Sequence, residues 1–307
     1  MCSDDMYFQL GLKGARRNPR RHQRHYRKEW PPPTIFVITT FLSTMAAGSS
    51  ALDSQLLQKA QSIRRELSNS IPTSDDLFIP SCYEKPGNGS VRGFSNWVVP
   101  RRLMVGQYPG PSPEPDGPPL KACQSHLELL VKEYNVRTFC SLQSEIPAQT
   151  DVDEWPVEGV FLEPYLRKDF PHPFVPYFPM VQCISNKSNS PKFLHFPILD
   201  LSTPDSNSLL GLLETLLDEM MAERSIYLHC WGGRGRAGLT AACLLSLLYP
   251  EHDLNSILDW IQRGYDTRLG ADQMSPGLRR SPQTTAQRSF VSKFVAQRQA
   301  AYQKHTS

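Results

Sequence analysis

Residues 229–240 read HCWGGRGRAGLT, and they separate a short apolar run at 226–228 from a longer one that ends at Leu248. The first run predicts a buried strand, and the second predicts an apolar helix that ends before Pro250. A glycine-rich turn from a strand into a helix directs backbone N–H groups and the positive end of the helix dipole toward one point. The segment therefore predicts an anion-binding turn within a fold that alternates strands and helices.

Two side chains of this turn indicate a chemistry for the bound anion. Cys230 follows the strand, where the field of the helix N-terminus favours the thiolate over the thiol. Arg236 lies six residues later, and its planar guanidinium can bind two phosphate oxygens. A thiolate directed at a phosphorus atom that an arginine and several amides hold is a nucleophile for phosphoryl transfer.

Two other phosphate-binding motifs overlap the same glycines. Gly233, Gly235 and Gly238 have the spacing of a dinucleotide-binding turn, but a predicted helix occupies the place of the second strand and its acidic residue. Gly233 and Gly238 also imitate a nucleotide-binding P-loop, but Leu239 stands where that motif needs lysine. Neither motif has a use for the cysteine, so we disfavour both.

Apolar periodicity on both sides of the turn alternates between strand and helix. Ordered structure is predicted to begin near residues 96–100 and to continue through 103–106. Strands are predicted at 136–142, 193–196 and 226–228. Helices are predicted at 120–133, from a cap at Asn207 or Ser208 to about 224, at 238–248 and at 254–261, with a last helix opening at Ser281-Pro282. Residues 163–192 are rich in proline and predict a long ordered loop. This alternation predicts an α/β fold with a central sheet.

The N-terminal part of the chain differs in composition from the rest. Residues 1–30 contain eight Lys or Arg and three acidic residues, a net charge of +5 that leaves −2 for the remainder. We expect residues 1–50 to be a basic, disordered leader and residues 51–93 to be a polar linker. The folded domain is then expected to cover residues 94–300.

The leader has three interpretations. Its apolar part, residues 35–47, has the length of a signal-peptide core and is shorter than the about 20 residues of a membrane-spanning helix. It is an organelle-targeting presequence, an unfolded basic leader, or an upstream extension of a protein that starts at Met45. We favour the last two over the presequence, because the basic region is longer than that of a usual presequence, and we expect a cytoplasmic protein without membrane association.

Charge and cysteine placement exclude several classes of function. No basic face is visible in the sequence after residue 30, which argues against a nucleic-acid partner. The seven cysteines contain no pair at zinc-ribbon spacing, and their wide spread argues against a secreted disulfide scaffold. We expect reduced thiols, no metal site and no cofactor.

Three motifs together resemble a known family. His-Cys-x5-Arg at 229–236 is similar to the signature loop of cysteine-based protein tyrosine phosphatases, in particular their dual-specificity class. The similarity extends to Phe196-Pro197-Ile198-x-Asp200 and to Ser281-Pro282-x-Thr284-x-x-Gln287. The resemblance implies a central, mainly parallel sheet flanked by helices.

The resemblance also implies roles for individual residues. Cys230 corresponds to the nucleophile, Arg236 to the phosphate clamp and Asp200 to the general acid, with Asp205 as a rival on the same loop. Asp205 is disfavoured because it equally fits a helix cap. The amides expected to complete the phosphate-binding cradle belong to Trp231, Gly232, Gly233, Arg234, Gly235 and Arg236.

The chain departs from the family at Ala237, where a serine or threonine is usual. A hydroxyl there hydrogen-bonds the thiolate, and losing such a bond costs about 1.5–3 kcal/mol, which is about tenfold to hundredfold in rate. Such a loss slows the site without abolishing its activity. Because Cys230, Arg236 and Asp200 are retained, we expect a phosphomonoester hydrolase of the dual-specificity type that acts through a phosphocysteine. The alternative is a slow or inactive pseudophosphatase that binds phosphorylated partners. The expected substrate is a phosphorylated protein, and a phosphoinositide or a phosphoglucan is the alternative.

Overall fold

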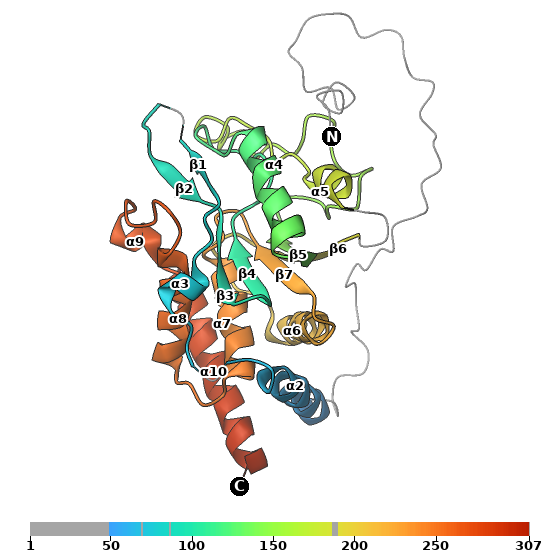
Figure 1. The fold of residues 1–307 in the computed structure, drawn as a ribbon, viewed down its shortest axis with the longest axis vertical. Helices are drawn as coiled ribbons and strands as arrows, with labels where there is room; N and C mark the ends of the chain where they lie inside the picture. Colours follow the sequence, from blue (N-terminus) through green and yellow to red (C-terminus); the bar gives the residue numbers. More distant parts are fainter. Residues whose placement is uncertain (1–48, 69, 86, 186–189, 307) are drawn as a thin grey trace, which may run out of the picture.

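The computed structural model describes residues 49–306 except 69, 86 and 186–189. A five-stranded sheet forms its centre in the order β3-β4-β7-β5-β6 (Figure 1). The strands are β3 (Ser95–Val99), β4 (Leu103–Gly106), β5 (Val136–Gln143), β6 (Lys192–Ile198) and β7 (Ser225–His229). All neighbours pair in parallel except β3 and β4. The prediction of a central, mainly parallel sheet is confirmed.

Helices flank this sheet in two groups (Figure 1). One group contains α4 (Leu120–Glu128), its π-helical continuation (Leu129–Glu133) and α5 (Phe178–Ile184). The other contains α2 (Ser49–Arg64), α6 (Ser206–Met221), α7 (Arg236–Leu248), α8 (Leu254–Asp266) and α10 (Thr285–Thr306). Two short helices, α3 (Ser74–Leu77) and α9 (Pro276–Arg279), and a hairpin of β1 (Cys82–Glu84) and β2 (Val91–Gly93) complete the fold.

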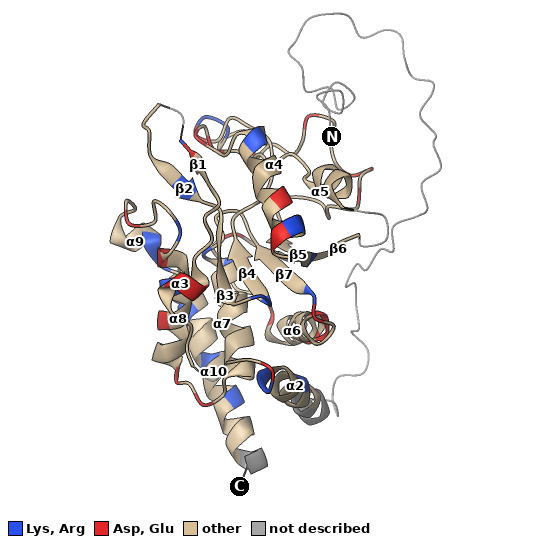
Figure 2. Cartoon of the chain, viewed as in Figure 1, with Lys and Arg blue, Asp and Glu red and all other residues tan. Residues whose placement is uncertain are grey.

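The helix that follows the predicted anion-binding turn lies at the centre of the second group. All thirteen residues of α7 are buried, and none after Arg236 is charged (Figure 2). The helix contacts α2, α6, α8 and α10 as well as β4 and β7. A helix that is apolar all round is stable only when it is covered on all sides, so its neighbours hold it and its N-terminus in place.

Residues 51–93 are not the linker that the sequence predicts. Leu56, Leu57, Ala60 and Ile63 of α2 are at most 5% exposed and belong to the core. Lys59 pairs with Glu214 and Asp218 of α6 at 2.9 and 2.7 Å, so the helix is tied to the domain by charge as well. The apolar stripe of α2 is narrow and the rest of the helix is polar, which is why composition alone suggested a linker.

Two further expectations differ from the structure in detail. The expected loop at 163–192 contains α5, whose Phe178, Met180 and Val181 are buried. The last helix begins at Thr285 rather than at Ser281-Pro282.

Of the expected leader, residues 1–48 lie outside the described residues.

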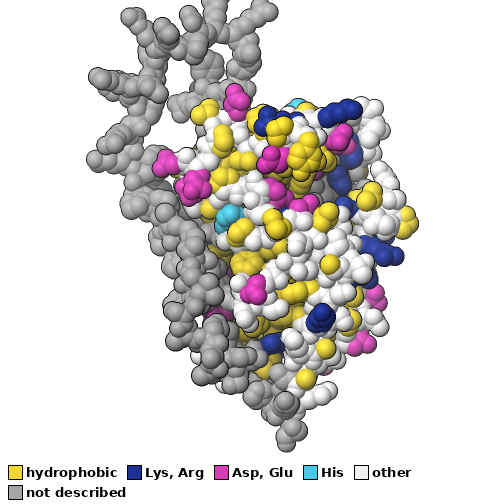
Figure 3. Space-filling view, turned by 180° about the vertical axis from the view of Figure 1, so that it is seen from behind, with side chains coloured by type: hydrophobic (Ala, Val, Ile, Leu, Met, Phe, Trp, Pro, Cys, Tyr) yellow, Lys and Arg dark blue, Asp and Glu magenta, His cyan; other side chains and the backbone are white. Residues whose placement is uncertain are grey.

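The surface of the described chain mixes charge types. Seen from behind, acidic and basic side chains are scattered among hydrophobic ones (Figure 3). Within the described ranges, no helix combines the length and the hydropathy that crossing a membrane requires.

Candidate active site

The turn between β7 and α7 lies at the edge of the sheet where the parallel strands end. We name residues 230–236 the anion loop. In open α/β sheets, ligands bind outside the carboxyl ends of the strands, because loops and helix N-termini converge there. Cys230 follows β7 directly and is 3% exposed, and Arg236 begins α7. The loop therefore has the placement that its sequence predicts.

One glycine of the loop is required by close packing. Gly233 has φ +68°, and a Cβ atom there would lie 2.2 Å from the carbonyl carbon of Gly106 in β4. Only glycine avoids both the backbone strain and this collision. By contrast, a Cβ atom on Gly232 would meet open space. Gly233 thus lets the anion loop sit directly against the end of β4.

Four successive carbonyl oxygens of the loop accept hydrogen bonds from outside it. The donors are the Tyr108 amide to Trp231 at 2.8 Å, the Arg268 guanidinium to Gly232 at 3.4 Å and to Gly233 at 2.9 Å, and the Ser281 hydroxyl to Arg234 at 2.9 Å. In a trans peptide the N–H points opposite to the C=O. The N–H groups of residues 232–235 therefore point away from these donors, toward the inside of the loop.

Arg236 is held by two carboxylates. Its Nη1 and Nη2 donate to the Oε2 and Oε1 atoms of Glu145 at 2.6 and 2.7 Å, and Nη2 lies 3.0 Å from Oδ1 of Asp200. Burial acts to lower the pKa of Arg236, but its hydrogen bonds to Glu145 and the nearby Cys230 and Asp200 raise that pKa above its usual value. Its Nε is buried and has no hydrogen-bond partner among the described residues.

The structure separates the two aspartates that the sequence left as rivals. Asp200 is 47% exposed at its side chain and faces Arg236. Asp205 instead caps α6, because its Oδ2 accepts from the Ser208 amide at 2.9 Å and the Ser208 hydroxyl at 3.0 Å. Only Asp200 is in contact with the anion loop among these two.

The histidine before the cysteine is buried and neutral. Nε2 of His229 lies 2.7 Å from the hydroxyl oxygen of Tyr177. Burial lowers the pKa of His229 to about 3, so the imidazole carries no charge at neutral pH. It contributes hydrogen bonding and packing to the loop rather than a positive charge.

Near the start of α7 and α10, two polar side chains have defined hydrogen-bond partners and one alanine has none to offer. Ala237 is fully buried and offers no hydroxyl. The Thr240 hydroxyl donates to the Arg236 carbonyl at 3.0 Å, so it is directed along the helix. Gln287 of α10 is buried, and its side-chain amide donates to the Ser202 carbonyl at 3.0 Å. Gln287 thereby joins α10 to the loop that carries Asp200.

Comparison with known proteins identifies this arrangement. Residues 179–291 match a family model described as "PTP-SAK: Swiss Army Knife protein, DSP-PTPase phosphatase domain". Over these residues the chain is similar to the dual-specificity-like members of the cysteine-based protein tyrosine phosphatase superfamily. The matched segment contains the anion loop, Asp200 and Gln287, the residues on which the resemblance in the sequence rests.

Two known relatives align with the chain over a short stretch. "Cyclin-dependent kinase inhibitor 3" of Homo sapiens is 41% identical over 69 residues, which is 21% of this chain and 32% of the relative. "Putative tyrosine phosphatase 067L" of Invertebrate iridescent virus 3 is 38% identical over 61 residues, or 19% and 25% of the two chains. The chain thus spans about a third or less of the length of these relatives.

A solved structure of the superfamily aligns over more of the chain at lower identity. It is kinase associated phosphatase (KAP) with its catalytic-site cysteine replaced by serine. The two chains are 20% identical with a TM-score of 0.41, over 65% of this chain and 88% of that one.

The Trp231 side chain of the anion loop has partners in two segments, one before α4 and one after β5. The indole nitrogen of Trp231 donates to Oε1 of Glu114 at 2.6 Å, and the ring packs edge-on against Phe170 and Phe174. Trp231 is therefore fixed as a wall of the loop.

Among the described residues, no three His, Cys, Asp or Glu side chains are grouped as a metal site requires.

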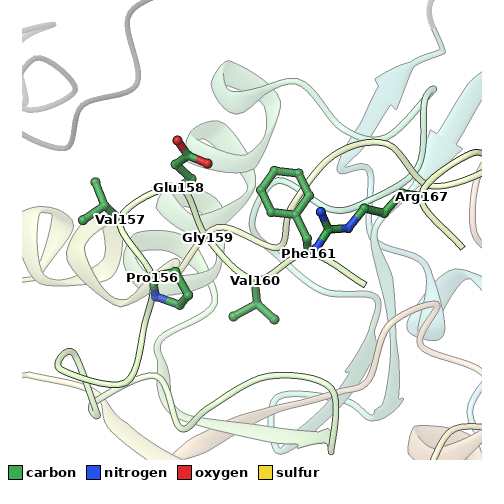
Figure 4. A pocket seen from close by; sticks show the side chains of 7 residues that line it. All are labelled: Pro156, Val157, Glu158, Gly159, Val160, Phe161 and Arg167. Atoms are coloured by element: carbon green, nitrogen blue, oxygen red, sulfur yellow. The ribbon is translucent and has the colours of Figure 1, made fainter. Parts of the chain in front are cut away.

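The segment after β5 also carries a hollow that no residue of the anion loop lines. A cavity of about 530 Å³ is lined by residues 156–161 and Arg167 (Figure 4). The Arg167 guanidinium lies 4.9 Å from the centre of the Phe161 ring, beside which Figure 4 draws it. None of the residues that the sequence predicts for the site lines this cavity.

Two residues that contact the anion loop have no signal in the motifs. Glu145 follows the end of β5, and Arg268 follows α8, far from the loop in sequence. The position of Glu145 just after a predicted buried strand was a usable indication, because parallel strands end at one edge. Nothing in the sequence distinguishes Arg268 from the surface arginines.

Proposed function

We propose that this protein is a phosphomonoester hydrolase of the dual-specificity protein phosphatase type that acts through a phosphocysteine intermediate. The observation that carries the proposal is the convergence of Cys230, Arg236 and Asp200 at one end of the sheet, with Asp200 3.0 Å from Arg236. A nucleophile, a cation for the phosphate and an acid for the leaving group are the parts that such a reaction needs.

In the first step, the Cys230 thiolate attacks phosphorus, and the bond from phosphorus to the leaving oxygen breaks. Asp200, in its protonated form, transfers its proton to that oxygen, since an alkoxide is a poor leaving group. Such proton transfer contributes typically about 10²–10⁴-fold to the rate. The products of this step are the free alcohol and a phosphocysteine.

In the second step, water hydrolyses the phosphocysteine. The Asp200 carboxylate now accepts a proton from the water, whose oxygen bonds to phosphorus while the bond from sulfur to phosphorus breaks. Inorganic phosphate leaves, and Cys230 and Asp200 return to their starting forms. Ala237 offers no hydroxyl to stabilise the departing thiolate, which makes this step the slower one.

Arg236 is already oriented for the phosphate before substrate binds. Glu145 fixes the two Nη atoms, and the buried Nε is left without a partner among the described residues. A bound phosphate can accept a hydrogen bond from Nε and a second one from Nη2, where it replaces Asp200. These two parallel hydrogen bonds are charge-assisted. The same exchange frees Asp200 for the leaving group.

A phosphorylated protein is the substrate class that we favour. The name of the viral relative describes a tyrosine phosphatase, which supports an aryl phosphate on a polypeptide. Phosphoinositides and phosphoglucans present the same dianion and are the alternatives. Phosphate release from a phosphotyrosine peptide, a phosphoserine peptide, a phosphoinositide and a phosphoglucan, measured with one enzyme preparation, ranks the four.

The test of the enzyme proposal is hydrolysis of para-nitrophenyl phosphate by the purified full chain, with Cys230→Ser as the matched control. We expect turnover by the parent and none by the variant, because the serine hydroxyl is not ionised at neutral pH. Equal rates in parent and control would overturn the proposal.

A second candidate, a pseudophosphatase that binds phosphorylated partners without turnover, is favoured by one observation. Ala237 removes the hydroxyl that assists the second step. Retention of Cys230 and Asp200 argues for the enzyme, because a binding module needs neither group. Binding of a phosphotyrosine peptide with no phosphate release over hours would favour the pseudophosphatase.

A further inference from the structure

A buried arginine lies behind the anion loop and is not used in the chemistry proposed above. Arg268 follows α8 and is 5% exposed. Its Nε donates to Oδ1 of Asn96 at 2.8 Å, and its Nη2 donates to the Val105 carbonyl at 2.8 Å. These two partners belong to β3 and β4, so the guanidinium is anchored to the edge of the sheet beside the loop.

The remaining hydrogen bonds of Arg268 reach the anion loop itself. Nη2 donates to the Gly233 carbonyl at 2.9 Å, and Nη1 donates to the Gly232 carbonyl at 3.4 Å. One planar group therefore spans β3, β4 and the loop. The fork geometry of arginine makes this possible, since a lysine ammonium is a single point of attachment.

The contacts have a directional consequence for the loop. Because the carbonyls of Gly232 and Gly233 point at Arg268, the N–H groups of the next two residues, Gly233 and Arg234, point the opposite way. That direction is the inside of the loop, where an oxyanion would bind. Gly233 is in the left-handed region at φ +68°, a conformation that glycine occupies easily and leaves just as easily. Something outside the loop must therefore fix its peptide planes.

No carboxylate in the described part of the chain forms an ion pair with Arg268. Its surroundings are backbone carbonyls, the Asn96 amide and the Tyr265 ring, whose centre lies 4.7 Å away. A buried cation without a carboxylate partner favours a negative charge nearby, and the anion loop lies against it.

We propose that Arg268 is a positioning residue of the phosphatase site: its guanidinium holds the carbonyls of Gly232 and Gly233 so that the amides behind them face a bound oxyanion. The inference rests on the proposed function, because it assumes that the loop binds a phosphate group. Arg268 does not touch the substrate and acts through the loop.

The test measures oxyanion binding directly, with tungstate as the probe and isothermal titration calorimetry on the full chain. Arg268→Met removes the charge and the fork, and Arg268→Lys keeps the charge but not the fork. We expect both to weaken tungstate binding, by about tenfold to hundredfold for Arg268→Met, the effect of losing a hydrogen bond that involves a charged group. Arg268→Lys should recover part of that loss.

Two further variants separate positioning from general stability. Asn96→Ser removes one anchor of Arg268 and keeps its charge, and we expect tungstate binding to weaken by about threefold, a partial loss of one hydrogen bond. Arg64→Gln is the matched control, because Arg64 pairs with Glu251 and stacks on Tyr249 at 4.2 Å, away from the loop. It should lower thermal stability without changing the dissociation constant.

The outcomes distinguish this inference from the proposed function. If the Arg268 variants fold and bind tungstate with the dissociation constant of the parent, the inference is overturned. If the Arg268 variants do not fold, an unchanged dissociation constant for tungstate in Asn96→Ser overturns it. A parent that binds no tungstate overturns it as well. A parent that binds tungstate but hydrolyses no phosphomonoester refutes the enzyme proposal only, and the inference then depends on the binding constants of the variants.

Discussion

Arg236 shows how a single side chain depends on its neighbours. Its charge is buried, and Glu145 and Asp200 compensate it from two different loops. A planar fork can bind Glu145 with two nitrogens and still present a third nitrogen to a ligand, which a point charge cannot do. The geometry therefore requires arginine specifically rather than any cation.

Arg236→Lys is expected to lower kcat/KM for para-nitrophenyl phosphate by about 10²–10³-fold, the usual effect of losing one donor that stabilises transition-state charge. Steady-state kinetics at saturating and limiting substrate measure the loss. Arg234→Lys, in the same loop, is the control and should cost less, because the Arg234 side chain has no such carboxylate clamp among the described residues. A variant at position 236 that keeps most of its activity would contradict the assigned phosphate geometry.

Ala237 is the residue at which the chain departs from the family that it resembles. If the missing hydroxyl slows hydrolysis of the phosphocysteine, that intermediate accumulates and the alcohol is released in a burst before a slow steady state. Ala237→Ser is expected to raise the steady-state kcat by about tenfold to hundredfold and to leave the burst rate unchanged. Rapid-quench kinetics on both proteins measure this. With no burst in the parent and no gain in the variant, another group must activate the second step, and Gln287 is the first to examine.

At the scale of elements, Glu219 ties α6 to two strands at the end of the sheet opposite the anion loop. This carboxylate is 2% exposed, accepts from the Thr138 hydroxyl of β5 at 2.6 Å, and pairs with Lys192 and Arg224 at 2.8 Å each. Burial acts to raise the pKa of Glu219, but the hydrogen bonds from Lys192 and Thr138 outweigh it and the pKa is lowered overall.

The lowered pKa of Glu219 predicts a pH-dependent stability. The stabilisation is fully present above the unfolded-state value of about 4.3 and is lost as the pH falls through the folded-state value. As the pH is lowered from 6 through the folded-state pKa of Glu219, the free energy of unfolding of the parent should fall. The free energy of unfolding of Glu219→Gln should fall less steeply over the same interval. Urea unfolding at several pH values measures both slopes. Parallel slopes would show that other carboxylates account for the acid sensitivity.

At the scale of the whole molecule, residues before the central sheet complete the core. Leu56, Leu57 and Ile63 of α2 and Leu77 of α3 are at most 5% exposed. Burying such a side chain stabilises a protein by about 1.5–3 kcal/mol, so four of them contribute about 6–12 kcal/mol. That is comparable with the about 5–15 kcal/mol of net stability of a typical domain.

A protein that starts at residue 94, the boundary expected from the sequence, should therefore be unstable. We expect one that starts at residue 49 to unfold cooperatively and the shorter one to lack a cooperative transition or to aggregate. Thermal unfolding followed by circular dichroism compares them. Equal unfolding temperatures would mean that α2 and α3 add nothing to the core.

The sequence by itself determined the features that are local in the chain. The strands β5, β6 and β7 and the helices α4, α6, α7 and α8 followed from apolar periodicity. The anion loop followed from the spacing of Cys230, its glycines and Arg236, because a strand, a turn and a helix that are adjacent in sequence fix one another. The preference for Asp200 over Asp205 also rested on local spacing, and the capping of α6 by Asp205 agrees with it.

Only the tertiary structure decided which distant residues meet. Glu145 reaches Arg236 because β5 and β7 are adjacent parallel strands that end at one edge. Arg268 reaches the carbonyls of the loop because α8 packs against β3. The narrow apolar stripe of α2 became core because α6 and α7 cover it. Such contacts depend on the packing of elements far apart in the chain, and no local pattern in the sequence records that packing.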